Sequence, residues 1–148
     1  EINYLDRYLQ MEQMRFGDSF SFGISVHPDV QINVIQIPAM LFQPFVENAL
    51  RHGIRYKQEG FGKVLLYFSV DAGVLLCSVK DNGVGRQKAA EYKSHQPIEY
   101  QSKGVELTSK RIELLNKINE YAISVQIIDL LDEQGQPSGT EVIIKIPV

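Results

Sequence analysis

The segment from Leu41 to Gly53 constrains the fold most, because two kinds of residue recur in it with a helical period. Its apolar members have the spacing of one buried helical face. These apolar members are Leu41, Phe42, Phe45, Val46, Ala49 and Leu50. The polar members share the opposite face, and they are Gln43, Glu47, Asn48 and Arg51. Amide and carboxylate oxygens suit Mg²⁺ and a guanidinium suits phosphate, although an ordinary solvated helix face would show the same pattern.

Length and charge indicate one globular domain. The chain has 148 residues, of which 44% are hydrophobic and 22% are charged, so it can bury a core. Its formal net charge is −3 and it has no run of like charges, which argues against a nucleic-acid surface. The single Cys77 lies in an apolar run, so we expect a buried thiol and an intracellular chain. The longest apolar runs are only as long as a β-strand, so none is expected to span a membrane.

The rest of the chain predicts a mixture of helices and strands that do not strictly alternate. The expected elements are a helix over 2–15, a strand over 19–26, a helix from Pro38 to Gly53, hairpin strands over 64–70 and 74–80, a loop with one helical turn over 86–103, a helix over 104–119, and strands over 121–131 and 140–146. Pro44 is expected to kink or restart the second helix. This order favours an α+β class, a two-layer sandwich with helices on one face of a mixed sheet.

The helix over 104–119 is expected to pack its apolar residues against that sheet. The residues expected to be buried are Val105, Leu107, Ile112, Leu114, Leu115 and Ile118.

A second motif, Asp81-Asn82-Gly83-Val84-Gly85, directly follows a predicted strand. Asp-Asn-Gly is also a common hairpin turn, but no strand pattern follows it here. A carboxylate at a strand end can accept a hydrogen bond from an exocyclic amine, and neighbouring glycines allow the backbone to approach a flat base. Asp81 is therefore a candidate acceptor for the amino group of adenine.

Two further motifs are weaker when each is taken alone. Ser102-Lys103-Gly104-Val105 leads into a helix, whose free N–H groups and positive dipole end suit phosphate, with Lys103 as an added charge. A plain helix start after a loop explains it equally simply. Gly139-Thr140 precedes the last strand and is, by itself, a turn glycine before a β-branched residue. The sequence has no P-loop, GxGxxG, HExxH, zinc-like or Ser/His/Asp signature.

The order and spacing of these four motifs resemble the ATP-binding domain of sensor histidine kinases, in the GHKL superfamily, and more narrowly the LytS/YehU type. The matching segments are Ile37 to Gly53 for the N box, Asp81 to Gly85 for the G1 box, Gly104 to Leu115 for the G2 region and Gly139-Thr140 for the end of the fold. The resemblance covers essentially the whole chain. It implies the Bergerat ATP-binding fold over residues 18–148, with residues 1–17 as the tail of the dimerisation and phosphoacceptor helices.

For the helix, the resemblance implies ATP and Mg²⁺ as cofactors. Asn48 would coordinate the metal that bridges the phosphates, and Glu47 would help to hold the ion or its waters. Arg51 and His52 lie where the family places side chains that contact phosphate.

For the other motifs, the resemblance implies that Asp81 binds the adenine amino group, with Thr140 supporting it through water. Residues 86–103 would form the lid over ATP. The remaining implied contacts are Gly83 and Gly85 at the adenine wall and lid hinge, and Lys103 and Gly104 at the phosphates.

The resemblance further implies a two-component kinase whose γ-phosphoryl acceptor is a histidine upstream of this fragment. Its partners would be a response regulator and a second copy, joined through the upstream helices. The membrane would be reached only through the parent protein, as the cytoplasmic domain of an inner-membrane bacterial sensor. Because His27, His52 and His95 lack the acceptor context, the chain is expected to bind ATP–Mg²⁺ without phosphorylating itself.

Two positions depart from the family pattern. Glu106 stands where the G2 region often has glycine, so it either faces away from phosphate or weakens its binding. Pro44 stands where hydrolytic members carry a general-base glutamate, which favours a kinase over an ATPase. Glu106 and the short lid leave an alternative open, in which the chain is a degenerate nucleotide-binding or dimerisation module without kinase activity.

Overall fold

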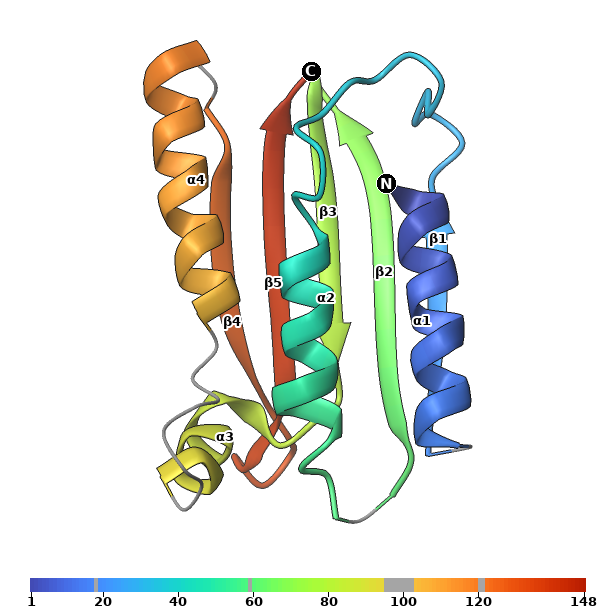
Figure 1. Ribbon diagram of the computed structural model, residues 1–148, viewed down its shortest axis with the longest axis vertical. Coiled ribbons are helices and arrows are strands. Elements are labelled where there is room, and N and C mark those ends of the chain that lie inside the picture. Colours follow the sequence, from blue (N-terminus) through green and yellow to red (C-terminus); the bar gives the residue numbers. More distant parts are fainter. Residues whose placement is uncertain (18, 59, 95–102, 120–121) are drawn as a thin grey trace.

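A computed structural model describes residues 1–148 except 18, 59, 95–102 and 120–121 (Figure 1). The elements in chain order are α1 (Ile2–Phe16), β1 (Phe20–Val26), α2 (Gln43–Asn48), the π-helical turn η1 (Ala49–Ile54), β2 (Gly62–Asp71), β3 (Val74–Asp81), α3 (Gly85–Ser94), α4 (Lys103–Asn119), β4 (Ser124–Leu131) and β5 (Pro137–Pro147). No helix in these described ranges has both the length and the apolar character that crossing a membrane requires.

One mixed sheet forms the back of the molecule, with strand order β1-β2-β3-β5-β4. Strands β1 and β2 are parallel, and the other three pairings are antiparallel. Figure 1 shows α1, α2 and α4 side by side across one face of this sheet. The predicted α+β sandwich is therefore confirmed, as is the hairpin between β2 and β3.

The core lies between the sheet and these helices. In β2, the buried residues Val64, Leu66 and Phe68 alternate with exposed ones, as expected for a strand with one solvated face. The ring of Phe42 meets that of Phe68 edge to face, with centroids 5.4 Å apart. Cys77 is a buried free thiol, as predicted. The predicted burial of the apolar residues is confirmed, because each is at most 5% exposed, although the first two precede α2: Leu41, Phe42, Phe45, Val46, Ala49 and Leu50.

The boundaries of the central helix differ from the prediction. The helix begins at Gln43 rather than near Pro38, and Pro44 occupies its first turn. A proline there loses no intrahelical hydrogen bond, so the helix starts at this point and is not kinked. The N-cap residue of α2, Phe42, makes no side-chain capping bond. The carboxylate of Glu1 caps the helix instead, because it accepts hydrogen bonds from the free backbone N–H groups at the helix start. These bonds come from Leu41 (3.1 Å), Phe42 (2.7 Å) and Gln43 (3.2 Å).

The predicted stop at Gly53 is also wrong. The helix widens into the turn η1 and includes Gly53, with the N–H of Arg55 donating to the carbonyl of Leu50 at 2.9 Å. A bond that spans five residues defines a π-turn, and such turns are frequent at functional sites.

The segment predicted as a loop over 86–103 is partly wrong as well. Helix α3 occupies Gly85–Ser94, and its Arg86 forms a bidentate ion pair with Asp129 of β4, with both N–O distances at 2.7 Å. This contact fixes the start of α3 against the sheet. The remainder of the predicted lid, residues 95–102, lies outside the described residues.

Helix α4 covers the edge of the sheet with a narrower face than predicted. Ile112 is buried, and Val105 and Leu115 are half-buried. Three residues expected in the core are instead exposed, namely Leu107 (63%), Leu114 (57%) and Ile118 (74%). An edge helix contacts the sheet along one stripe only, whereas the sequence pattern spreads leucines over more than one face.

A matched pair of isoleucines tests this arrangement. Replacing Ile144 of β5, which is fully buried, with alanine is expected to lower the free energy of unfolding by about 2–5 kcal/mol, because it leaves a cavity. The exposed Ile118→Ala variant is expected to change it by less than about 0.5 kcal/mol. Urea unfolding followed by circular dichroism measures both. Equal losses would contradict the described packing of α4.

Candidate functional site

Asp81 is a buried carboxylate at the end of the central strand β3. It is 5% exposed, and its Oδ1 accepts a hydrogen bond from the N–H of Gly83 at 2.9 Å. Burial raises the pKa of Asp81 from 3.8 to about 6, although the N–H groups of Gly83 and Thr140 and the charge of Lys57 lower it. No ion pair to Asp81 occurs in the described part of the chain. The carboxylate is therefore mostly ionised at neutral pH and keeps unused acceptor capacity.

Three glycines allow the backbone to close around Asp81. A Cβ on Gly53 would lie 2.6 Å from Oδ1 of Asp81, one on Gly83 would collide with the backbone of Gly53, and one on Gly139 would collide with the carbonyl of Asp81. The N–H of Val84 donates to the carbonyl of Gly53 at 3.3 Å. The end of the first motif thus contacts the second motif directly, although Gly53 was predicted only as a helix stop.

Asn82 anchors the loop that follows Asp81. Its side chain accepts from the N–H of Lys63 at 2.6 Å and donates to the carbonyl of Phe61 at 2.9 Å. The ammonium of Lys57 donates to the backbone carbonyl of Asn82 at 3.0 Å. The chain then enters α3, so the alternative of a simple hairpin turn at Asp-Asn-Gly is wrong.

Thr140 lies opposite Asp81 in the pairing of β3 with β5, and it is 9% exposed. The structure therefore brings together Asp81, Gly83 and Thr140, which were all predicted as site residues. Gly85 is near them in sequence and opens α3 with a φ of 79°, a conformation that suits glycine.

Glu47 and Asn48, the last two residues of α2, have different surroundings. Glu47 accepts a hydrogen bond from Nε2 of Gln43 at 2.6 Å, and the same amide nitrogen donates to the hydroxyl of Tyr4 on α1 at 3.1 Å. Burial and the charges of Glu12 and Glu47 raise the pKa of the nearby Tyr8 to about 12. Asn48, by contrast, is half-buried, and its amide makes no hydrogen bond to any residue that the structure describes. Glu47 is thus held toward α1, whereas Asn48 is available to a ligand.

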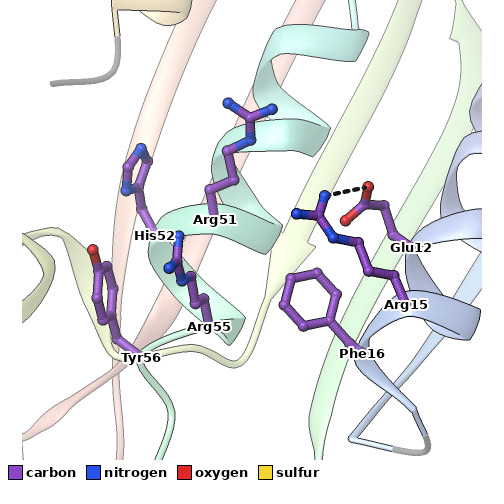
Figure 2. Close-up of a pocket in the computed structure, with 7 residues that line it drawn as sticks. All are labelled: Glu12, Arg15, Phe16, Arg51, His52, Arg55 and Tyr56. Atoms are coloured by element: carbon purple, nitrogen blue, oxygen red, sulfur yellow. Dashed lines mark ion pairs between the residues drawn. The ribbon is translucent and has the colours of Figure 1, made fainter. Parts of the chain in front are cut away.

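Arg51 and His52 lie on η1 and line a pocket of about 440 Å³, which extends from α1 to the segment that follows η1 (Figure 2). The other residues that line it are Glu12, Arg15 and Phe16 from α1, and Arg55 and Tyr56 after η1. The contribution of α1 was not predicted. Glu12 and Arg15 continue the polar spacing of Tyr4 and Tyr8 along α1, but only the docking direction of α1 shows that they face η1.

The predicted phosphate residues at α4 are less well defined. The side chain of Lys103 lies outside the described side chains. Gly104 is exposed, and its carbonyl accepts from Oγ1 of Thr108 at 2.8 Å. Glu106 is exposed and forms an ion pair with Lys110 at 2.7 Å, which partly offsets its charge.

Sequence comparison finds related sensor proteins, although no family model matches the chain. Sensor protein LytS of Oceanobacillus iheyensis is 30% identical over 138 residues, which are 92% of this chain and 21% of that protein. LytS of Bacillus subtilis is 38% identical over 85 residues, which are 57% of this chain and 14% of that protein. Sensor histidine kinase YpdA of Escherichia coli is 34% identical over 85 residues, with the same coverage of 57% and 14%. The chain therefore spans only 14–21% of the length of these relatives.

Solved structures share the fold at low sequence identity. The histidine kinase domain of the blue-light activated kinase of Erythrobacter litoralis EL346 has a TM-score of 0.62 and 19% identity, over 98% of this chain and 59% of that one. The mycobacterial sensor histidine kinase MprB has a TM-score of 0.61 and 19% identity, over 99% of this chain and 93% of that one. The sequence relatives show that the chain belongs to the LytS-type sensor histidine kinases, and its fold is that of histidine kinase domains.

Proposed function

We propose that this chain binds ATP with Mg²⁺ and supplies the γ-phosphoryl group to a histidine outside the chain, upstream of residue 1. The observation that supports this most is the buried carboxylate of Asp81, which is enclosed by the backbones of Gly53 and Gly83. A flat ring can approach such a backbone closely. The carboxylate accepts the exocyclic amine of adenine, whereas the corresponding carbonyl of guanine would meet its lone pairs. Asp81 therefore selects ATP over GTP.

The residues at the end of α2 fit the magnesium ion that accompanies ATP. Asn48 offers a hard amide oxygen that has no partner among the described side chains, and Mg²⁺ commonly takes one or two such ligands and keeps its waters. Glu47, held by Gln43 at 2.6 Å, would help to hold the ion or its waters. Within the described residues there is no cluster of three His, Cys, Asp or Glu side chains, and water and the phosphates of ATP would supply the remaining ligands of the ion. Bound Mg²⁺ neutralises charge on the phosphates during transfer.

The reaction is transfer to a protein histidine rather than hydrolysis. Pro44, one helical turn before Asn48, has no group that could activate water. Phosphoryl transfer requires positioning and charge neutralisation, which Asn48 and the cationic side chains of η1 provide. The partners are then a response regulator and a second copy of the parent sensor, joined through its upstream helices. The chain forms the cytoplasmic part of an inner-membrane parent.

One observation favours a second candidate, a degenerate module that has lost nucleotide binding. Glu106 carries a negative charge in the first turn of α4, where phosphate is expected. Its ion pair with Lys110 weakens this objection. Isothermal titration with ATP and Mg²⁺ separates the two candidates, because binding at roughly −8 to −5 kcal/mol supports the kinase. Absence of heat at millimolar nucleotide supports the degenerate module.

Asp81→Asn tests base recognition. The substitution keeps the shape of the side chain but places a donor beside the adenine amine, so the affinity for ATP is expected to fall about tenfold or more, a loss of at least ~1.4 kcal/mol. Isothermal titration with ATP and GTP measures this loss. Asp71→Asn, a change at the exposed last residue of β2, serves as the control and should leave affinity unchanged. Equal affinity of the unaltered chain for ATP and GTP would rule out this role.

Asn48→Ala tests the metal ligand. The unaltered chain is expected to bind ATP more tightly in the presence of Mg²⁺ than in the presence of EDTA. Removing the amide oxygen of Asn48 is expected to abolish most of this difference in affinity. Asn33→Ala, at an exposed loop position, is the matched control. A variant that lacks Asn48 and still shows the full magnesium effect would show that the ion is held elsewhere.

The pKa of Asp81 predicts how stability depends on pH. The carboxyl group of Asp81 keeps its proton up to about pH 6 in the folded chain but only up to pH 3.8 in the unfolded chain. Protonation of Asp81 therefore stabilises the folded state fully below pH 3.8, and this stabilisation is lost as pH rises through 6. The loss amounts to about 3 kcal/mol. Asp81→Asn lacks this titration, so its stability relative to the unaltered chain is expected to improve between pH 4.5 and 8. Denaturant unfolding at several pH values measures the difference, and a difference independent of pH would contradict the burial of a titrating carboxyl.

A further inference from the structure

The pocket between α1 and η1 concentrates positive charge. Three guanidinium groups and one carboxylate line it, from Arg15, Arg51, Arg55 and Glu12. Figure 2 shows Arg15 extending from α1 toward Arg51 on η1 and Arg55, which directly follows η1. These groups sum to a formal charge of +2 (three positive, one negative), within a chain whose net charge is −3.

The one carboxylate compensates this charge only in part. The distance between Glu12 Oε1 and Arg15 Nη1 is 3.7 Å, and the side chain of Arg15 is 76% exposed. Arg51 and Arg55 are both exposed and form no ion pair with any residue in the described ranges. Two guanidinium groups therefore face the pocket with their donors available.

Such a pocket suits an oxyanion better than an apolar or cationic ligand. A guanidinium presents planar, forked donors that match the oxygens of phosphate, and several cations around one hollow raise the local concentration of anions. The volume of about 440 Å³ lies within the range of small-molecule sites. Phe16 adds an apolar side chain to the lining of the pocket.

We propose that this pocket is a binding site for a phosphate-class oxyanion, held by Arg15 of α1 together with Arg51 and Arg55. Helix α1 is then part of the ligand site and not only a cover for the core. Two sources can supply the oxyanion. One is the polyphosphate tail of a nucleotide, and that case rests on the proposed function. The other is a separate phosphoryl group or free phosphate, which does not depend on it.

The test uses Arg15→Gln and Arg55→Gln in the 148-residue chain, with Arg7→Gln as the control. Arg7 is an exposed arginine on the same helix but outside the pocket. ATP, adenosine and inorganic pyrophosphate are titrated separately by calorimetry. Thermal unfolding verifies that each variant is folded. Each pocket variant is expected to weaken binding of pyrophosphate, of ATP or of both about three- to tenfold, while Arg7→Gln and adenosine binding stay unchanged.

The variant Glu12→Gln is expected to change oxyanion affinity in the opposite direction from the arginine variants. Removing the one carboxylate that lines the pocket among the described residues is expected to strengthen oxyanion binding, which damage to the packing would not do.

Weakening of ATP binding in the arginine variants identifies the nucleotide tail as the source, whereas weakening of pyrophosphate binding alone identifies a separate phosphoryl group. Unchanged binding of both probes in both arginine variants overturns the site. Failure of adenosine to bind the unaltered chain would instead count against the proposed function, and the pyrophosphate arm would still test the pocket.

Discussion

The contact between the backbones of Gly53 and Gly83 is the constraint on which the site depends. It brings the end of the central helix against the end of β3, so closely that neither position can carry a Cβ without displacing the other segment or the carboxylate of Asp81. The contact buries Asp81 and raises its pKa to about 6. It also fixes the helix that carries Asn48 relative to that carboxylate. One packing contact between two motifs thereby positions both the proposed metal ligand, Asn48, and the proposed base acceptor, Asp81.

Polar contacts along the central helix join it to α1 as well. The carboxylate of Glu1 caps its first turn, and Gln43 bonds both Tyr4 and Glu47. Further along, Arg15 shares a pocket with Arg51. A displacement of α1 would therefore change the cap, the orientation of Glu47 and the cationic pocket together. Under the proposed function, in which α1 would continue from the phosphoacceptor helices, these contacts would connect those helices to the proposed nucleotide site.

Features that depend on the local periodicity of residues were predicted from the sequence. Features that depend on how helices and strands pack against one another were missed. The buried face of the central helix was predicted correctly, because its six apolar residues recur at helical spacing whatever lies opposite. The start of the helix was misplaced, since Pro38 and Pro44 are both plausible first-turn prolines and only the cap from Glu1 selects the second. Leu114 and Ile118 were placed in the core because the pattern cannot show that α4 lies at the sheet edge. The role of Gly53 and the pocket at Arg15 required the tertiary contacts.

The most direct test of the account is a crystal structure of this chain with Mg²⁺ and a non-hydrolysable ATP analogue. We expect the adenine amine within hydrogen-bond distance of the Asp81 carboxylate and the metal ion coordinated by the side-chain oxygen of Asn48. A nucleotide bound with its base away from Asp81, or with its metal ion away from Asn48, would contradict it.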